Sequence, residues 1–286
     1  MEIRFISGVF GLFFLLVFII ITDIGPRPKG KTMNLFIETL IIAFAINTIF
    51  FIYAFIRKTD VVTDLSYSLS FLLATTYIYI VHAEKNILQT MLLVIVVLWA
   101  LRLGSYLLSR ILATKVDHRF DEKRNSFVRF GIFWLLQATA VWVILLPITF
   151  AMGINGLVIN MPFLIVGFVI SLFGLVYETV ADHQKNTFKK KNPKKLTTHG
   201  LWSTSRHPNY FGEILVWWGT LIVVLPYLSG PLFLVALGPV FITVLLLFVS
   251  GVNLLEKSWK EKYGEEAYYQ EYIRQTSLFI PWKKRK

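Results

Sequence analysis

The stretch that decides the fold is Leu221-Ile-Val-Val-Leu-Pro-Tyr-Leu-Ser-Gly-Pro-Leu-Phe-Leu-Val-Ala-Leu-Gly-Pro-Val-Phe-Ile-Thr-Val-Leu-Leu-Leu-Phe248, which contains no charged residue. A second run, Leu35 to Phe55, carries a single acid. A helix needs about 20 consecutive apolar residues to cross the core of a bilayer. Of the 286 residues, 56% are hydrophobic and 16% are aromatic. The sequence therefore predicts a polytopic membrane protein rather than a soluble domain.

The predicted fold is an all-α, polytopic transmembrane helical bundle of about eight spans. Hydropathy places these spans near Phe5 to Ile21, Leu35 to Ile56, Asp64 to Val81, Leu88 to Leu108, Val128 to Phe150, Phe163 to Ala181, Tyr210 to Pro226 and Leu232 to Leu255. No small-residue cleavage pattern follows the first run, so we expect a retained span and not a signal peptide. Residues 1–34 are therefore predicted to form an extra N-terminal span and loop, and residues 35–286 the main membrane domain.

The charges of the loops predict how the spans are oriented. With both termini in the cytoplasm, most of the 29 Lys and Arg residues lie on the cytoplasmic side, as the positive-inside rule requires. The loop from Gly25 to Gly30 is the one basic loop on the opposite side. These loops also explain most of the net charge of +12. We expect an integral, multi-pass protein of a bacterial inner membrane rather than of the endoplasmic reticulum.

Polar and ionisable residues gather directly before one apolar run, in the segment His199-Gly-Leu-Trp-Ser-Thr-Ser-Arg-His-Pro-Asn-Tyr-Phe-Gly-Glu213. Asn209 and Glu213 are four residues apart, so they share one face of a helix. A buried glutamate on an apolar helix predicts a functional site. The alternative is a glutamate that pairs with a neighbouring cation for packing alone. We expect this segment to form the cytoplasmic site of the protein.

Two further acids, Glu178 and Asp182, lie four residues apart at the end of the preceding apolar run. They either belong to the same site or extend their carboxylates to the membrane surface as snorkelling residues. Six lysines follow between Lys185 and Lys195. Such a cluster attracts a multiply phosphorylated anion, although it would attract lipid headgroups equally well.

A third group of polar residues lies nearer the N-terminus. Arg102 and Tyr106 are one turn apart on the fourth predicted span, which places a guanidinium within the membrane. Such a charge needs an anionic partner, and Asp64 at the start of the third span is a candidate. Tyr67 follows Asp64 by three residues on the same helix. The alternative role for Asp64 is that of a helix N-cap. Gln137, on the fifth span, is expected to form an interhelical hydrogen bond.

Several kinds of chemistry are excluded by residue types and spacings. The chain has no cysteine, which excludes disulfides and thiolate ligands. His199 and His207 are eight residues apart with no third ligand at a suitable spacing, so we predict no metal site. No Gly-x-Ser-x-Gly, Gly-x-Gly-x-x-Gly or Walker-type segment occurs. Chemistry by a cofactor bound between helices is the remaining interpretation, and we expect no nucleic acid partner.

The residues also carry a resemblance to a known family. Asp182, the stretch from Gly200 to Arg206, Asn209-Tyr-Phe-Gly-Glu213-Ile-Leu-Val-Trp-Trp-Gly219 and the final Phe279-Ile-Pro-Trp282 resemble the steroid 5-alpha-reductase family (3-oxo-5-alpha-steroid 4-dehydrogenase, C-terminal domain), in particular its bacterial branch. The resemblance extends from near Asp64 to Trp282 and is most specific in the last third. It implies a seven-helix reductase core, to which the first predicted span is an addition.

This resemblance implies an NADPH-dependent membrane oxidoreductase that saturates the C=C bond of a hydrophobic enone, either a 3-oxo-Δ4 steroid or another lipid. Asn209 and Glu213 match the family's Asn-x-x-Gly-Glu segment, which contacts the nicotinamide end of the cofactor. Lys189 falls where the family commonly has a phosphate-binding arginine. The full set of expected cofactor-binding residues is Arg102, Glu178, Asp182, Lys189, Arg206, His207, Asn209, Tyr210, Glu213 and Tyr263.

The expected catalytic residues are Asp64, Tyr67 and Tyr106. By the resemblance, Asp64 matches a glutamate that helps polarise the carbonyl group of the substrate. Trp99 falls where the family has its partnering tyrosine, and an indole donates a hydrogen bond but no proton. We therefore expect either that Tyr106 or Tyr67 takes the role of that tyrosine, or that the substrate differs from a steroid.

Two alternatives to the reductase remain. Arg206-His-Pro-Asn-Tyr210, Glu256, Tyr263 and Tyr272 also resemble isoprenylcysteine carboxyl and phospholipid methyltransferases, which implies S-adenosylmethionine held near Glu256 and Arg206. The second alternative is a non-enzymatic lipid-binding or transport protein whose buried charges line a path through the membrane. In each case we expect a lipid or steroid-like ligand and membrane lipids as partners, without an obligate protein partner.

Overall fold

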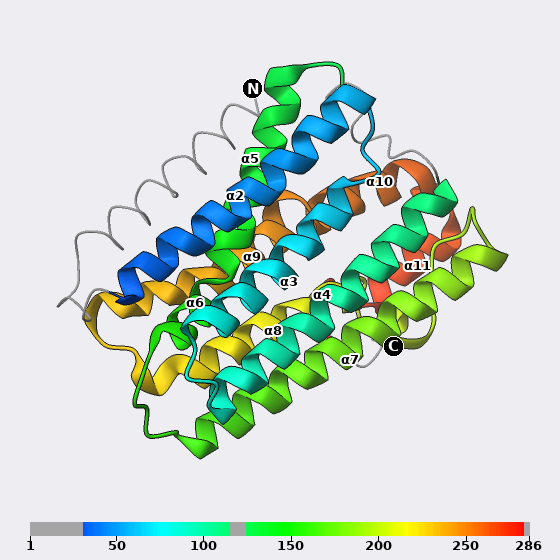
Figure 1. Ribbon diagram of the computed structural model, residues 1–286. Coiled ribbons are helices and arrows are strands. Elements are labelled where there is room, and N and C mark those ends of the chain that lie inside the picture. The colour runs from blue at the N-terminus through cyan, green and yellow to red at the C-terminus, as the bar shows by residue number, and fades with distance from the viewer. Residues whose placement is uncertain (1–30, 115–123, 283–286) are drawn as a thin grey trace. The chain divides into compact units, whose positions relative to one another are not determined.

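The computed structural model describes residues 31–114 and 124–282, and within these ranges the regular elements are helices (Figure 1). Seven of the described helical segments are long and apolar enough to cross a membrane: Leu35–Arg57, Thr63–His82, Ile87–Leu107, Phe127–Ile144, Met161–Lys191, Pro208–Tyr227 and Gly230–Tyr263. The predicted polytopic helical bundle is confirmed. The predicted first span, Phe5 to Ile21, lies outside the described residues, and the domain boundary at residue 34 stays a prediction.

The chain divides into two compact units. The first unit runs to Leu164 and includes Val223–Gly238, and the second comprises Ile165–Ile222 and Pro239–Lys286. The helices of the first unit are α2 (Lys31–Arg57), α3 (Thr63–His82), α4 (Ile87–Thr114), α5 (Phe127–Ile144), α6 (Leu146–Gly153), and the short turns η3 (Leu225–Tyr227) and η4 (Gly230–Ala236). Figure 1 shows α2, α3 and α4 side by side with similar axis directions, and α3 packs against both of the others.

The second unit contains most of α7 (Met161–Lys191), η2 (Gly200–Ser203), α8 (Pro208–Val224), most of α9 (Leu237–Val244), the π-helical turn η5 (Leu245–Val249), α10 (Val252–Tyr263) and α11 (Ala267–Gln275). Two sequence-based boundaries are wrong. The predicted span from Val128 to Phe150 is divided at Leu145, where α6 begins with Pro147 in its first turn. The lysine-rich stretch after Asp182 is helical as far as Lys191, because no proline or glycine interrupts it before Pro193.

A buried polar network joins three helices of the first unit. The Gln137 side-chain amide on α5 donates to Asn47 Oδ1 on α2 at 2.9 Å and to Ser66 Oγ on α3 at 2.8 Å. Asn47 Nδ2 in turn donates to Ser70 Oγ at 3.0 Å. Asn47, Ser66 and Ser70 are all buried. The predicted interhelical hydrogen bond of Gln137 is therefore confirmed.

Substitution of Gln137 by leucine is expected to destabilise the protein by about 1 to 2 kcal/mol, because Asn47 and Ser66 lose a buried partner. Thr139→Val is the matched control on the same helix. The Thr139 hydroxyl donates only to the carbonyl of Leu135 within α5, so its removal is expected to change little. Thermal unfolding in detergent measures both. Equal melting temperatures for Gln137→Leu and the wild type would contradict a stabilising role for the network.

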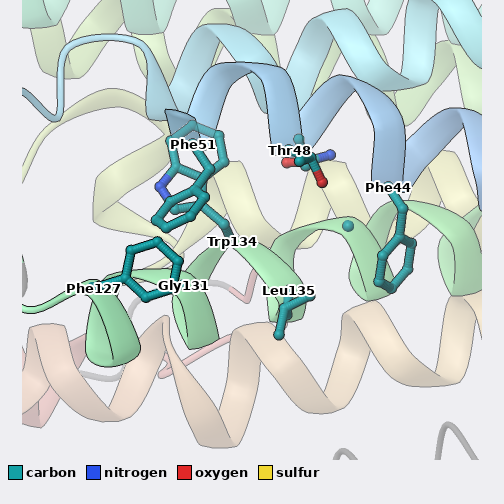
Figure 2. A pocket seen from close by; sticks show the side chains of 9 residues that line it. Phe44, Thr48, Phe51, Phe127, Gly131, Trp134 and Leu135 are labelled. Atoms are coloured by element: carbon teal, nitrogen blue, oxygen red, sulfur yellow. The ribbon is translucent and has the colours of Figure 1, made fainter. Parts of the chain in front are cut away.

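An apolar cavity of about 240 Å³ lies between α2 and α5 of the first unit (Figure 2). Figure 2 shows Phe44 near one end and Phe51, Phe127 and Trp134 near the other. Its polar lining is limited to Asn47 and Thr48. None of the predicted site residues lines this cavity.

Candidate functional site

Helices α7 and α8 of the second unit approach each other closely because glycines face each other between them. A Cβ atom on Gly212 would lie 2.7 Å from the Glu178 backbone nitrogen and 2.7 Å from the Gly174 carbonyl oxygen. One on Gly174 would lie 2.5 Å from the Gly212 carbonyl oxygen. Small residues at such contacts let helix backbones meet in a membrane. Ser171 strengthens the contact by donating to the Val216 carbonyl oxygen at 2.8 Å.

This contact positions the predicted acidic residues. Glu178 and Asp182 on α7 are 2% and 5% exposed, and Glu213 on α8 is 8% exposed. Snorkelling carboxylates would remain accessible, so the snorkelling alternative is wrong. Because Gly212 lies against the backbone of Glu178, the α7 acids and Glu213 come from the same helix interface. Asn209, one turn before Glu213, is half-buried.

The loop between α7 and α8 folds back onto α7. Gly200 has a φ of +63°, and a side chain at this position would collide with the Gln184 amide. The same amide oxygen accepts a hydrogen bond from the Leu201 backbone N–H at 2.8 Å. Trp202 Nε1 donates to the carbonyl oxygen of Ala181 at 2.9 Å. These contacts fix the start of the segment that leads to Arg206 and His207.

Arg206, His207 and Glu256 form a hydrogen-bonded cluster at the start of α8. Arg206 Nη1 donates to Glu256 Oε2 at 2.5 Å, and His207 Nε2 lies 2.8 Å from Glu256 Oε1. The imidazole forms stacked pairs with two aromatic rings, with centroid distances of 5.7 Å to Tyr210 and 5.1 Å to Trp259. The interplanar angles are 3° and 1°. The site thus combines a salt bridge with a buried and firmly held imidazole.

The environment of His207 sets its protonation. The side chain is 0% exposed, and this burial lowers the pKa of His207, although Glu256 acts in the opposite direction. The positive charges of Lys185 and Arg206 lower the pKa further. A carboxylate only accepts hydrogen bonds, so Nε2 carries the proton of the neutral ring. Nδ1 is then an acceptor, and among the described residues it has no hydrogen-bond partner.

The lowered pKa of His207 predicts a pH dependence of stability. Below about pH 6.5 the unfolded chain binds a proton at this histidine more readily than the folded protein does. The contribution of neutral His207 is therefore complete above about pH 6.5 and decreases as the pH falls through the folded pKa. We expect the difference in melting temperature between the wild type and His207→Gln to narrow from pH 8 to pH 5. The exposed His199, replaced by glutamine, is the matched control and should follow the wild type at each pH.

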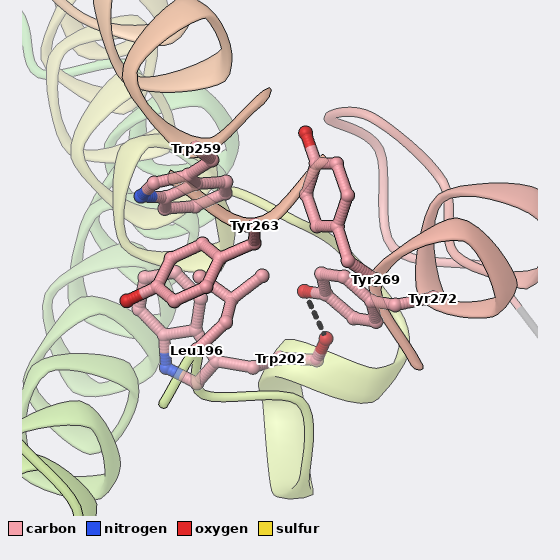
Figure 3. Packing of buried hydrophobic residues seen from close by; sticks show 6 residues of the cluster. All are labelled: Leu196, Trp202, Trp259, Tyr263, Tyr269 and Tyr272. Carbon is pink, nitrogen blue, oxygen red and sulfur yellow. Dashed lines mark hydrogen bonds between the residues drawn. The ribbon is translucent and has the colours of Figure 1, made fainter. Parts of the chain in front are cut away.

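A cluster of buried side chains supports the salt bridge (Figure 3). Its members are Leu196, Trp202, Trp259, Tyr263, Tyr269 and Tyr272. The Tyr272 hydroxyl donates to the Trp202 carbonyl oxygen at 2.7 Å, as the dashed line in Figure 3 shows. Burial raises the pKa of Tyr272, so its phenol remains a donor at physiological pH. The cluster holds α10 and α11 against the loop that carries the site.

Two lysines of α7 lie on this aromatic cluster. Lys185 Nζ is 4.9 Å from the centroid of the Trp202 ring. Lys189 Nζ donates to the Lys195 carbonyl oxygen at 2.7 Å and lies 6.0 Å from the centroid of the Tyr263 ring. The predicted cofactor-binding residues Lys189 and Tyr263 are therefore neighbours. Cation–π contacts of this kind hold a positive charge in place.

The segment Ser277–Trp282, called the C-terminal strap from here on, pairs with the loop that leads into α8. The Arg206 backbone N–H donates to the Ser277 carbonyl oxygen at 2.9 Å, and Trp282 N–H donates to the Thr204 carbonyl oxygen at 3.0 Å. The buried Ser205 hydroxyl donates to the Phe279 carbonyl oxygen at 2.6 Å and accepts from the His207 N–H at 3.1 Å. Sequence reasoning found Phe279 to Trp282 by resemblance alone and missed this pairing.

The predicted catalytic residues lie in the first unit. Asp64 is half-buried in the first turn of α3, and Val62 occupies the N-cap position, so the N-cap alternative for Asp64 is wrong. Arg102 lies over the Tyr106 ring, with its Cζ atom 5.8 Å from the centroid. Trp99 is fully buried against Phe71, at a centroid distance of 4.9 Å, and acts in packing.

Tyr67 packs against the same tryptophan, with its ring centroid 6.4 Å from that of Trp99.

The structure also contains an ion pair that sequence reasoning missed. Arg124 Nη1 lies 3.1 Å from Asp60 Oδ1, and the Asp60 side chain is 2% exposed. Asp60 and Arg124 are 64 positions apart in the sequence, so local spacing could not predict that they pair. The catalytic roles of Asp64, Tyr67 and Tyr106 stay predictions.

Comparison with known proteins identifies the family. A family described as "Protein of unknown function (DUF1295)" matches residues 50–276. The chain belongs to this family. The DUF1295 match includes every predicted site residue, from Asp64 to Tyr263, and ends immediately before the C-terminal strap. No solved structure matches the chain at the significance required of the other comparisons.

Two curated proteins are similar to this DUF1295 protein. Methanethiol S-methyltransferase 1 of Bradyrhizobium diazoefficiens is 29% identical over 153 residues, which are 54% of this chain and 47% of the relative. Delta(14)-sterol reductase of Arabidopsis thaliana is 28% identical over 170 residues, 53% of this chain and 42% of the relative. The chain thus matches less than half the length of each of these relatives.

Proposed function

We propose that this protein is a membrane enzyme that binds a nucleotide cofactor in its second unit, and that it is an NADPH-dependent reductase of a hydrophobic enone. The observation that carries the choice of NADPH is the position of Lys185. This lysine lies over the Trp202 ring of the aromatic cluster, and its charge acts on the pKa of His207. A phosphate-bearing cofactor at the site would use this lysine.

The residues of the second unit fit such a cofactor. The buried carboxylates Glu178, Asp182 and Glu213 can accept hydrogen bonds from ribose hydroxyls and from a carboxamide. His207 Nδ1 offers a buried acceptor that no described residue uses. Lys185 and Lys189 supply positive charge for phosphates, as a lysine point charge does elsewhere. We assign Arg206, Asn209, Tyr210 and Tyr263 to the same binding site.

The chemistry of the reduction would then be divided between cofactor and chain. Bound NADPH would supply a hydride to the β carbon of the enone, and uptake of a proton at the α carbon would complete the saturation. The task of the chain is to hold the carbonyl oxygen of the enone. We assign it to Asp64, which can donate a hydrogen bond only as the carboxylic acid, with Tyr67 or Tyr106 as a second donor. We also assign Arg102 to the binding of the cofactor. A steroid-like lipid enters from the bilayer, which also keeps water away.

A methyltransferase that uses S-adenosylmethionine is the second candidate, and a specific observation favours it. Glu256 already neutralises Arg206 through a bond of 2.5 Å, which reduces the capacity of that guanidinium to bind phosphate. With Glu178, Asp182 and Glu213 also buried, the site suits a cationic cofactor without phosphates. Similarity to a protein named methanethiol S-methyltransferase 1 supports this candidate as much as the sterol reductase supports the first.

Calorimetric titration of the purified protein with NADPH and, separately, with S-adenosylmethionine distinguishes the candidates. For a reductase we expect NADPH to bind selectively and Lys185→Gln to weaken binding about tenfold, since one close charge contact is lost. Lys260→Gln, an exposed lysine on α10, is the matched control and should retain the wild-type affinity. Selective binding of S-adenosylmethionine would establish the second candidate. Binding of neither would leave the non-enzymatic lipid-binding role.

A further inference from the structure

The side chains of the C-terminal strap alternate between half-buried and exposed positions. Its inward residues hold the loop of the site: Phe279 lies against Phe211, with ring centroids 5.7 Å apart. Leu278, Ile280 and Trp282 alternate with the inward positions and are 44%, 61% and 71% exposed. These three large apolar side chains are therefore the exposed part of the strap.

The strap lies where a membrane boundary is expected. It pairs with Thr204 to Arg206, and the candidate membrane span Pro208–Tyr227 begins two residues after Arg206. Phe211, which contacts the strap, is in the first turn of that span. The exposed apolar side chains of the strap are therefore attached to the end of a candidate membrane span. Tryptophan is enriched at this depth of a membrane protein.

Charge completes the argument for the partner. The residues that follow Trp282 in the sequence are Lys283-Lys-Arg-Lys286. A group of basic residues beside apolar anchors gains about 1 kcal/mol per charge near an anionic lipid surface. Apolar side chains with Trp on one side and cations next to them are typical of segments that lie in the membrane interface.

We propose that Leu278, Ile280 and Trp282 insert into the interfacial region of the bilayer, and that the four positive charges of the sequence Lys283 to Lys286 favour a surface of anionic phospholipids. The strap then anchors the loop of the site to the membrane surface. Its hydrogen bonds transmit this anchoring to Ser205 and Arg206. The proposal concerns the membrane contact and does not depend on which cofactor the site binds.

The absence of cysteine from the chain allows a direct test. Ile280→Cys carries a nitroxide label in the full-length protein, reconstituted in nanodiscs of phosphatidylcholine with or without phosphatidylglycerol. Arg274→Cys on α11 is the matched control, because its side chain is 73% exposed and lies outside the strap. We expect molecular oxygen to relax the label at position 280 more than a water-soluble nickel chelate does, and the reverse at position 274.

The lipid composition tests the charged part of the proposal. We expect the label at position 280 to lie deeper when phosphatidylglycerol is present, and this difference to disappear when Lys283 to Lys286 are all replaced by glutamine. A label at position 280 that is as accessible to nickel as the one at position 274 would overturn the proposal. A short distance between two labels at position 280, independent of lipid, would overturn it in favour of a second copy of the chain.

Discussion

Replacement of Glu256 by alanine is expected to lower the free energy of unfolding by about 2 to 3 kcal/mol and to weaken cofactor binding, because Arg206 and His207 lose the group that holds them in place. The change leaves the Arg206 guanidinium, whose side chain is only 12% exposed, without its carboxylate. It also removes the acceptor of His207 Nε2. Loss of one partner costs about 3 to 5 kcal/mol for a fully buried ion pair and less where water has some access, as at Glu256 with 22% of its side chain exposed.

Thermal unfolding and calorimetric titration measure the effect of Glu256→Ala. Glu265→Ala is the matched control, since Glu265 is an exposed acid in the same unit. The double variant Arg206→Leu, Glu256→Leu should recover part of the stability but not the binding, because no buried charge then remains unpaired. If Glu256→Ala melted and bound cofactor like the wild type, the cluster would not be the centre of the site.

Replacement of Gly212 by alanine is expected to disrupt the α7–α8 interface and weaken cofactor binding more than tenfold. The added methyl group would meet the Glu178 backbone nitrogen and the Gly174 carbonyl oxygen, and neither atom can rotate away. The helices must separate, at a cost of about 1 to 3 kcal/mol, and the buried carboxylates move with them.

Gly131→Ala is the matched control for this second prediction. Its new Cβ would lie 3.7 Å from Phe51, which is an ordinary contact, and alanine favours a helix over glycine by about 1 kcal/mol. We expect Gly131→Ala to melt at or above the temperature of the wild type. An unchanged affinity in Gly212→Ala would show that the position of Glu178 and Glu213 does not matter to binding.

Hydropathy alone predicted the membrane helices well. Seven of the eight predicted spans overlap the candidate spans of the described residues, because a run of apolar residues long enough to cross a bilayer has few other stable structures. The division at Leu145 was missed, since Leu-Pro within an apolar run changes hydropathy little. The π-helical turn before α10 was missed as well, because its residues are all apolar and hydropathy does not distinguish π from α helix.

The site was predictable only in part. Spacing placed Glu178 with Asp182 and Asn209 with Glu213, because residues four apart share a helix face. Spacing gave no reason to pair His207 with Glu256, which lies 49 positions further along the chain. Spacing likewise could not predict the hydrogen bond between the strap and the Arg206 backbone. The roles of Asp64, Tyr67 and Tyr106 stay predictions.

The π-helical turn Leu245–Val249 determines which side of α10 faces the site. Gly251 follows this turn as the N-cap of α10, and a Cβ there would lie 2.9 Å from the Tyr210 ring that stacks on His207. Each residue of an α-helix turns the chain by about 100°. Deletion of one residue from this turn would therefore rotate Glu256 and Trp259 away from the imidazole. The length of the apolar turn Leu245–Val249, rather than the identity of its residues, thus determines the direction in which Glu256 and Trp259 point from α10.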